Sequence, residues 1–93
     1  MASLRMLKRD INYLMDEVVT DSYLSLYFHP EHKDAIVGVI RDAVELRNSL
    51  YDRANRPAEK KSRSLVRKHY AAVRRDMFDG IDSLFVRLSE VGK

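Results

Sequence analysis

The three histidines are the side chains best suited to metal binding or proton transfer near neutral pH. They are His29, His32 and His69. Histidines that bind a metal from one helix face are typically four residues apart, or each follows a glutamate by three residues. None of the three histidines has either spacing. The chain contains no cysteine, which excludes thiolate zinc sites. We therefore predict no metal site; instead, His29 and His32 should flank a turn and His69 should make one hydrogen bond at the edge of the core.

Carboxylates could form an acid/base pair if two of them converged. The candidates are Asp16, Glu17, Asp21, Asp42 and Glu45. Glu17 and Asp21 are four residues apart, a spacing that places both on one outward strip of a helix and indicates an acidic face. The chain has only three glycines, and neither a glycine-rich phosphate loop nor a serine nucleophile elbow is present. We predict that the protein is not an enzyme, has no catalytic residues and uses neither a cofactor nor a small-molecule substrate.

Apolar residues recur every three or four positions in three long stretches, which is the pattern of amphipathic helices. The first stretch, residues 3–28, has one apolar row followed by an adjacent row, and both should face the core: Leu4, Leu7, Ile11, Leu14 and Val18, then Met15, Val19, Tyr23 and Leu26. The second stretch, residues 30–56, has a stripe of Ile36, Val39, Ile40, Ala43, Leu46, Leu50 and Ala54. The third, residues 64–91, has Val66, Tyr70, Val73, Met77, Ile81, Leu84, Leu88 and Val91.

Prolines, serines and one glycine suggest where these helices begin, end or bend. Pro30 ends the first helix and is suited to the first position of the second. The segment from Arg56 to Arg63 has no apolar period and reads as a loop. Ser3 and Ser64 are candidate N-caps. Gly80 interrupts the third helix, where it either permits close approach of another helix or introduces a small kink.

Length and composition limit the fold to one small domain. The chain has 93 residues, of which 45% are hydrophobic and 33% are charged, so it can bury a single core. Three apolar-faced helices with short connections can hide their stripes by packing antiparallel. We predict an all-α fold: one up-down-up antiparallel bundle of three long helices over residues 1–93. No stretch suits a membrane span or a signal peptide, so we expect a cytoplasmic protein.

Two charged amphipathic segments carry a resemblance to other proteins. The segments run from Asp42 to Arg47 and from Leu65 to Tyr70. Together with the three long helices, they resemble small all-helical bacterial proteins of uncharacterised function. The resemblance implies a helical fold and carries over no activity and no site.

Basic residues gather at one end of the predicted bundle. An antiparallel arrangement brings residues 1–12 and 50–72 to the same end, which we call the basic pole. It holds ten basic and three acidic side chains, a net charge of +7, whereas the rest of the chain carries seven basic and eleven acidic ones, a net charge of −4. The ten basic residues are Arg5, Lys8, Arg9, Arg53, Arg56, Lys60, Lys61, Arg63, Arg67 and Lys68. Cations at two helix N-termini oppose the helix dipoles, which suggests an anion site for phosphates of a nucleic acid; the alternative is a face kept charged for solubility.

Aromatic residues gather near the first turn. Tyr27 and Phe28 either close the end of the bundle or, if exposed, contact a protein partner. We rank a non-enzymatic module that binds a protein partner or a second copy of itself first. A nucleic-acid or ribosome-associated accessory protein that uses the basic pole comes second.

Overall fold

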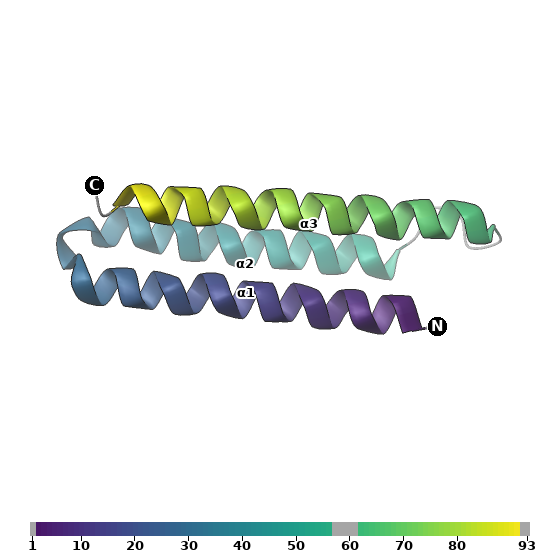
Figure 1. Ribbon diagram of the computed structural model, residues 1–93, viewed down its shortest axis with the longest axis horizontal. Coiled ribbons are helices and arrows are strands. Elements are labelled where there is room, and N and C mark those ends of the chain that lie inside the picture. Colours follow the sequence, from purple (N-terminus) through teal and green to yellow (C-terminus); the bar gives the residue numbers. More distant parts are fainter. Residues whose placement is uncertain (1, 57–61, 92–93) are drawn as a thin grey trace.

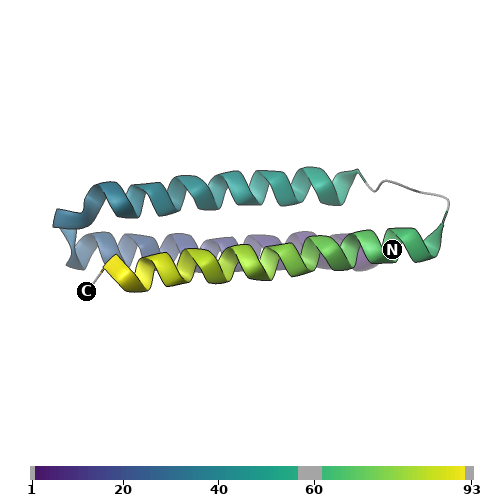
Figure 2. The same ribbon diagram turned by 90° about the horizontal axis from the view of Figure 1, so that it is seen from above.

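The structure, a computed structural model, describes residues 2–56 and 62–91. Helix α1 spans Ala2–Phe28, the short 3-10 helix η1 spans Pro30–His32, α2 spans Lys33–Asn55 and α3 spans Arg63–Val91. The three long helices lie side by side, with α1 and α3 running in one direction and α2 in the other (Figures 1 and 2). The bundle measures 52 × 17 × 15 Å. The predicted all-α up-down-up bundle is confirmed.

The predicted apolar stripes form the core. The hydrophobic residues that the structure buries come from all three long helices: Leu7, Ile11, Met15, Val18, Ile36, Val39, Ala43, Leu50, Ala54, Val73, Met77, Ile81, Leu84 and Leu88. Leu4, Leu14, Leu46 and Tyr70 pack against this core and remain partly exposed. Tyr23 is 60% exposed, so its predicted place in the core was wrong. Ser22 is buried beside it instead, and its hydroxyl donates to the carbonyl oxygen of Val18 at 2.7 Å.

A turn of 3-10 helix connects α1 to α2, in place of the direct start of the second helix at Pro30 that was predicted. The amide of His29 donates to the carbonyl oxygen of Ser25 at 2.7 Å, which completes the last turn of α1. Pro30 then begins one turn of 3-10 helix, in which the amide of His32 donates to the carbonyl oxygen of His29 at 3.0 Å. The α-helix itself begins at Lys33, three residues later than predicted. The chain thus reverses direction within a few residues and sets α2 directly against α1.

Both predicted N-caps were misplaced. The cap of α3 is Ser62, whose hydroxyl oxygen accepts a hydrogen bond from the amide of Leu65 at 3.3 Å. Since α3 begins at Arg63, Ser64 lies inside its first turn. Ser3 lies inside α1, which begins at Ala2. Residues 57–61, the centre of the predicted loop, lie outside the described part of the chain.

Gly80 lies where α3 approaches α2 closely. A Cβ atom at this position would stand 2.6 Å from Cδ2 and 3.1 Å from Cδ1 of Leu46. These separations are shorter than a van der Waals contact, so any larger residue requires Leu46 to move. Of the two predicted explanations for this glycine, close approach of another helix agrees with the structure.

We expect the effect of Gly80→Ala to depend on Leu46. In a Leu46→Ala background the substitution should raise the free energy of unfolding by about 1 kcal/mol, because alanine is the better helix former. In the wild-type background the same change should be less favourable by about 0.5–3 kcal/mol, since the new methyl group displaces Leu46. Urea unfolding of the four chains measures both values. Equal effects in the two backgrounds would show that Leu46 does not restrict this position.

Candidate functional site

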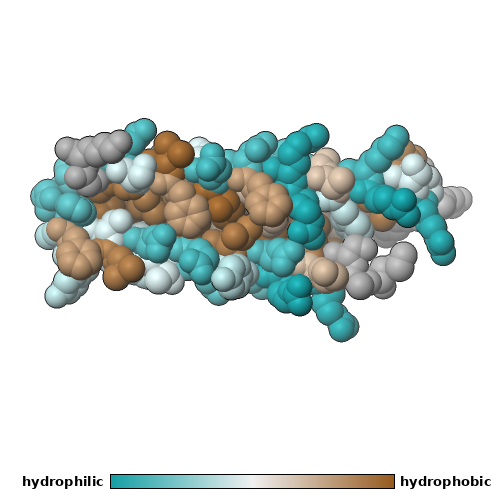
Figure 3. Space-filling model, in the orientation of Figure 1, coloured by the Kyte–Doolittle hydropathy of each residue, from teal (hydrophilic) through white to brown (hydrophobic). Residues whose placement is uncertain are grey.

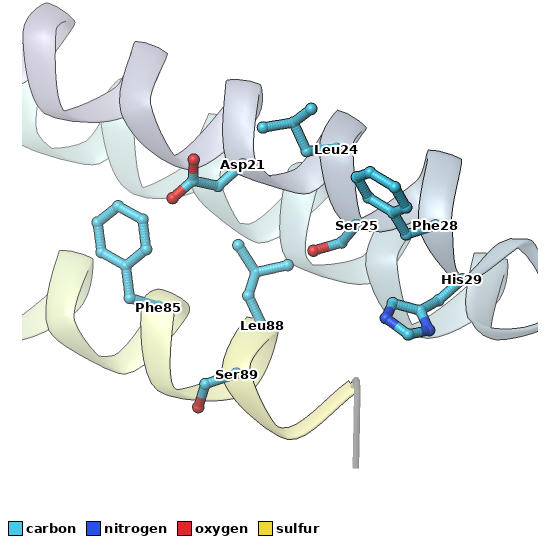
Figure 4. A pocket seen from close by; sticks show the side chains of 8 residues that line it. All are labelled: Asp21, Leu24, Ser25, Phe28, His29, Phe85, Leu88 and Ser89. Carbon is cyan, nitrogen blue, oxygen red and sulfur yellow. The ribbon is translucent and has the colours of Figure 1, made fainter.

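An apolar groove lies between α1 and α3 near the end of the bundle where α1 ends. It has a volume of about 470 Å³ and is open to solvent along its length. Leu24 and Phe28 border it from α1, and the Phe85 and Leu88 side chains extend into it from α3 (Figure 4). The remaining lining residues are polar: Asp21, Ser25, His29 and Ser89.

The groove arises because each of the two helices carries apolar residues beside its core stripe. Phe78 and Phe85 are seven residues apart, which places them on one side of α3. Leu24 and Phe28 are four residues apart on α1. Phe78 is 53% exposed and Phe28 is 69% exposed, so neither is absorbed by the core. Figure 3 shows the result as a band of apolar surface that runs from one end of the bundle to beyond its middle, between hydrophilic borders.

Both residues that were predicted to contact a partner, Tyr27 and Phe28, are exposed, and Phe28 lines the groove. Tyr27 is 80% exposed and points away from the core, and its ring meets that of Phe28 edge to face at a centroid distance of 5.2 Å. They do not close the end of the bundle. The sequence reasoning missed Phe78 and Phe85, although their seven-residue spacing beside the predicted stripe was a signal that could have identified them.

Three interhelical ion pairs fix how the helices lie against one another. Arg74 on α3 holds Asp10 on α1 at 2.8 Å. Arg87 holds Asp42 of α2 at 2.7 Å, and Arg53 of α2 holds Asp76 of α3 at the same distance. The hydrogen bond from Arg87 lowers the pKa of the Asp42 carboxyl below its ordinary value, because it stabilises the charged form. These pairs lie beside the core and set the level of each helix along the bundle.

Several carboxylates on the groove side of the bundle remain without an ion-pair partner among the described residues. Asp21 is half-buried in the groove, whereas the sequence predicted it on an outward strip. Glu17 and Asp82 are exposed. The apolar band is therefore accompanied by negative charge toward the end of α1.

The described segments of the predicted basic pole lie together, at the end where α1 begins and α2 ends (Figure 1). Part of its charge is neutralised: besides the Arg53–Asp76 pair, Arg56 lies 3.3 Å from Asp52 and Arg9 lies 3.8 Å from Asp10. Lys8 stands 6.0 Å from the centre of the Tyr51 ring. Lys60 and Lys61 lie outside the described residues. The cations of the pole that make no ion pair with any carboxylate of residues 2–56 and 62–91 are Arg5, Lys8, Arg63, Arg67 and Lys68.

The start of α3 projects beyond the ends of the other two helices (Figures 1 and 2). Arg63 is the first residue of α3, Arg67 and Lys68 follow within its first two turns, and all three are exposed.

The histidines occupy structural positions. His69 Nε2 lies 2.6 Å from the carbonyl oxygen of Arg53, so this nitrogen carries the proton and donates, as predicted for the core edge. The rings of His29 and His32 lie 3.5 and 3.8 Å from the carboxylate of Glu31. The pKa of this carboxyl is lowered, mainly because it accepts a backbone hydrogen bond and to a smaller extent because of the two rings. Within the described ranges, no three histidine, aspartate or glutamate side chains converge as metal ligands would.

Two further findings concern the chain as a whole. In the parts that the structure describes, no helix has an apolar run long enough to cross a membrane. The chain matches no family model, no curated protein and no solved structure.

Proposed function

We propose that the protein is a non-enzymatic interaction module that receives the apolar face of another helix in the α1–α3 groove. The observation that carries the proposal is the exposure of large apolar side chains on this side of the bundle, above all Phe28 in the groove and Phe78, which lies on the same side of α3 as the groove residue Phe85. Burying one such side chain completely contributes about 1.5–3 kcal/mol, so a helix that covers several of them gains a useful binding energy. Aromatic residues in a groove are also typical anchors of protein interfaces. The cysteine-free composition supports the expectation of a cytoplasmic protein.

Photocrosslinking from defined positions tests this proposal. A photoreactive phenylalanine analogue in place of Phe78 is expected to give protein adducts in cells, because this exposed residue lies on the same side of α3 as the groove residue Phe85. Val86 is similarly exposed at 48% and lies on another side of α3, so the analogue there is the matched control. Adducts from position 78 and few from position 86 agree with the proposal. The absence of adducts at both positions, or equal adducts from both, would show that the groove is not a docking site.

A second candidate function is nucleic-acid binding by the basic pole. It is favoured by the five cations of the pole that make no ion pair within the described residues, three of which are exposed in the first two turns of α3. Such an arrangement suits phosphate contacts that are insensitive to base sequence.

A further inference from the structure

We infer that the occupant of the α1–α3 face is a second copy of the same chain, packed antiparallel to the first and centred on Phe78. The inference rests on the proposed docking function of the groove and names its partner. Three observations support it: the order of residue types along α3, the unequal charge of the two ends of the bundle, and the size of the face.

The residues on the groove side of α3 are complementary to themselves in reverse order. Phe78 is the centre; four residues before and after it stand Arg74 and Asp82, and seven residues before and after it stand Ala71 and Phe85. These spacings correspond to about 6 and 10 Å along a helix, so all five side chains share one strip. In an antiparallel pair related by a two-fold axis at Phe78, each Arg74 meets Asp82 of the second copy. Each Ala71 likewise meets Phe85 of the second copy, a small residue against a large one.

The contacts within one chain leave these side chains available for such a pair. Phe78 is 53% exposed, and Ala71 and Asp82 are exposed. Asp82 has no ion-pair partner among the described residues, while Arg74 uses Nη1 for Asp10 and has further donors on its guanidinium group. The Arg74–Asp10 ion pair joins α1 to this strip of α3.

The charges of the whole bundle favour the same orientation. The basic pole has a net charge of +7 and the rest of the chain has −4. A parallel pair would set Arg74 against Arg74 and pole against pole, and like charges brought together in an interface are strongly unfavourable. An antiparallel pair sets each basic pole over the acidic part of the other copy. Charge thus selects the antiparallel arrangement over the parallel one.

The face is large enough for a stable pair. A long side of a bundle measuring 52 × 17 × 15 Å is comparable with the roughly 800 Å² that each partner contributes to a standard interface. The apolar band supplies the central part of this area, and hydrophilic residues lie along its borders (Figure 3). This is the anatomy of an interface with an apolar centre and a polar rim.

Sedimentation of the purified full chain tests the pairing. The wild type is expected to sediment at twice the chain mass, and Asp82→Arg is expected to weaken the pair at least about tenfold, since it sets arginine against Arg74 of the second copy. Asp79→Arg makes the same change in net charge at an exposed position on another side of α3, and it should remain paired. Equal behaviour of the two variants would overturn the inference.

Restoring the charges in a mixed pair makes the test independent of folding. Arg74→Asp alone should also weaken the pair at least about tenfold, and an equal mixture of Arg74→Asp and Asp82→Arg chains should associate again, because each arginine then meets an aspartate. A mixture that stays monomeric, although each variant is helical by circular dichroism, would overturn the inference.

Disulfide formation determines the orientation, because the natural chain has no cysteine to interfere. In an antiparallel pair, Ala71→Cys and Phe85→Cys chains mixed together are expected to link to each other. Two Ala71→Cys chains should not link, since their sulfurs would stand about 21 Å apart along the helices, far beyond the reach of a disulfide. Preferential linkage of Ala71→Cys chains to one another would indicate a parallel pair and contradict the inference.

The outcomes distinguish this inference from the proposed function. A wild-type chain that is monomeric up to about 1 mM, a concentration that would reveal even weak pairing, overturns the second-copy inference. If the analogue at position 78 then still links to a different protein in cells, the docking function stands with another partner. If it links to nothing, both fail.

Discussion

Replacing Leu50 by alanine is expected to lower the free energy of unfolding by about 2–5 kcal/mol. Leu50 is 1% exposed and belongs to the core cluster that all three long helices share. The substitution removes apolar contacts and leaves a cavity that the rigid helices fill only in part. Small domains are stable by about 5–15 kcal/mol in total, so the loss is a large fraction of the whole. Urea unfolding followed by circular dichroism measures it.

Leu65→Ala is the matched control, because it removes the same atoms from a side chain that is 49% exposed. We expect it to change the free energy of unfolding by less than about 0.5 kcal/mol. Similar losses for the two variants would mean that burial does not explain the contribution of Leu50, and the assignment of the core would have to be revised.

The helices and their buried faces could be predicted from the sequence because burial repeats with the helical period. Ile11, Val39 and Val73 are buried where their stripes predicted. The prediction failed for Tyr23 because a count of apolar residues passes over Ser22. The buried strip continues through Ser22, whose hydroxyl donates to a carbonyl oxygen of the preceding turn and so loses little when it leaves water.

Helix boundaries were less predictable, since neighbouring residues can serve the same purpose. Two serines, Ser62 and Ser64, stand near the start of α3, and either hydroxyl can cap a helix. Which one does so depends on where the helix begins, and α3 begins at Arg63. Pro30 was correctly placed at a helix start, although the first turn is 3-10 rather than α.

The groove and the ion pairs beside the core depend on how far each helix is shifted along its neighbours. The apolar pattern of one helix carries no information about this shift, so neither feature could be predicted. Asp10 and Arg74 are 64 residues apart and meet because α1 and α3 run in the same direction at one particular level. The basic pole was predictable, because alternating helix directions alone bring its segments together. The Arg53–Asp76 pair was not, since Asp76 lies just beyond the predicted limit of the pole.

The double variant Arg63→Glu, Lys68→Glu is expected to weaken binding to a single-stranded RNA oligonucleotide by at least about tenfold at low salt, if the basic pole contacts phosphates. Each phosphate contact contributes roughly 0.7 to the slope of log affinity against log salt for a single strand, so losing two should reduce the slope by about 1.4. Fluorescence anisotropy over a salt series measures both quantities. A wild-type chain that does not bind at low salt would remove the second candidate function.

Two features of this variant separate lost binding from lost folding and from net charge. A glutamate at position 63, in the first turn of α3, suits the helix dipole and contributes about 0.3–1 kcal/mol, so we expect the variant to be at least as stable as the wild type. The control Lys33→Glu, Arg41→Glu makes the same change in net charge on α2, outside the basic pole. Because only the first variant removes cations from the start of α3, a loss of affinity confined to it assigns the phosphate contacts to the pole. Equal losses in both variants would mean that the RNA responds to the overall charge of the chain, and the cations of the pole would then be a solvated surface.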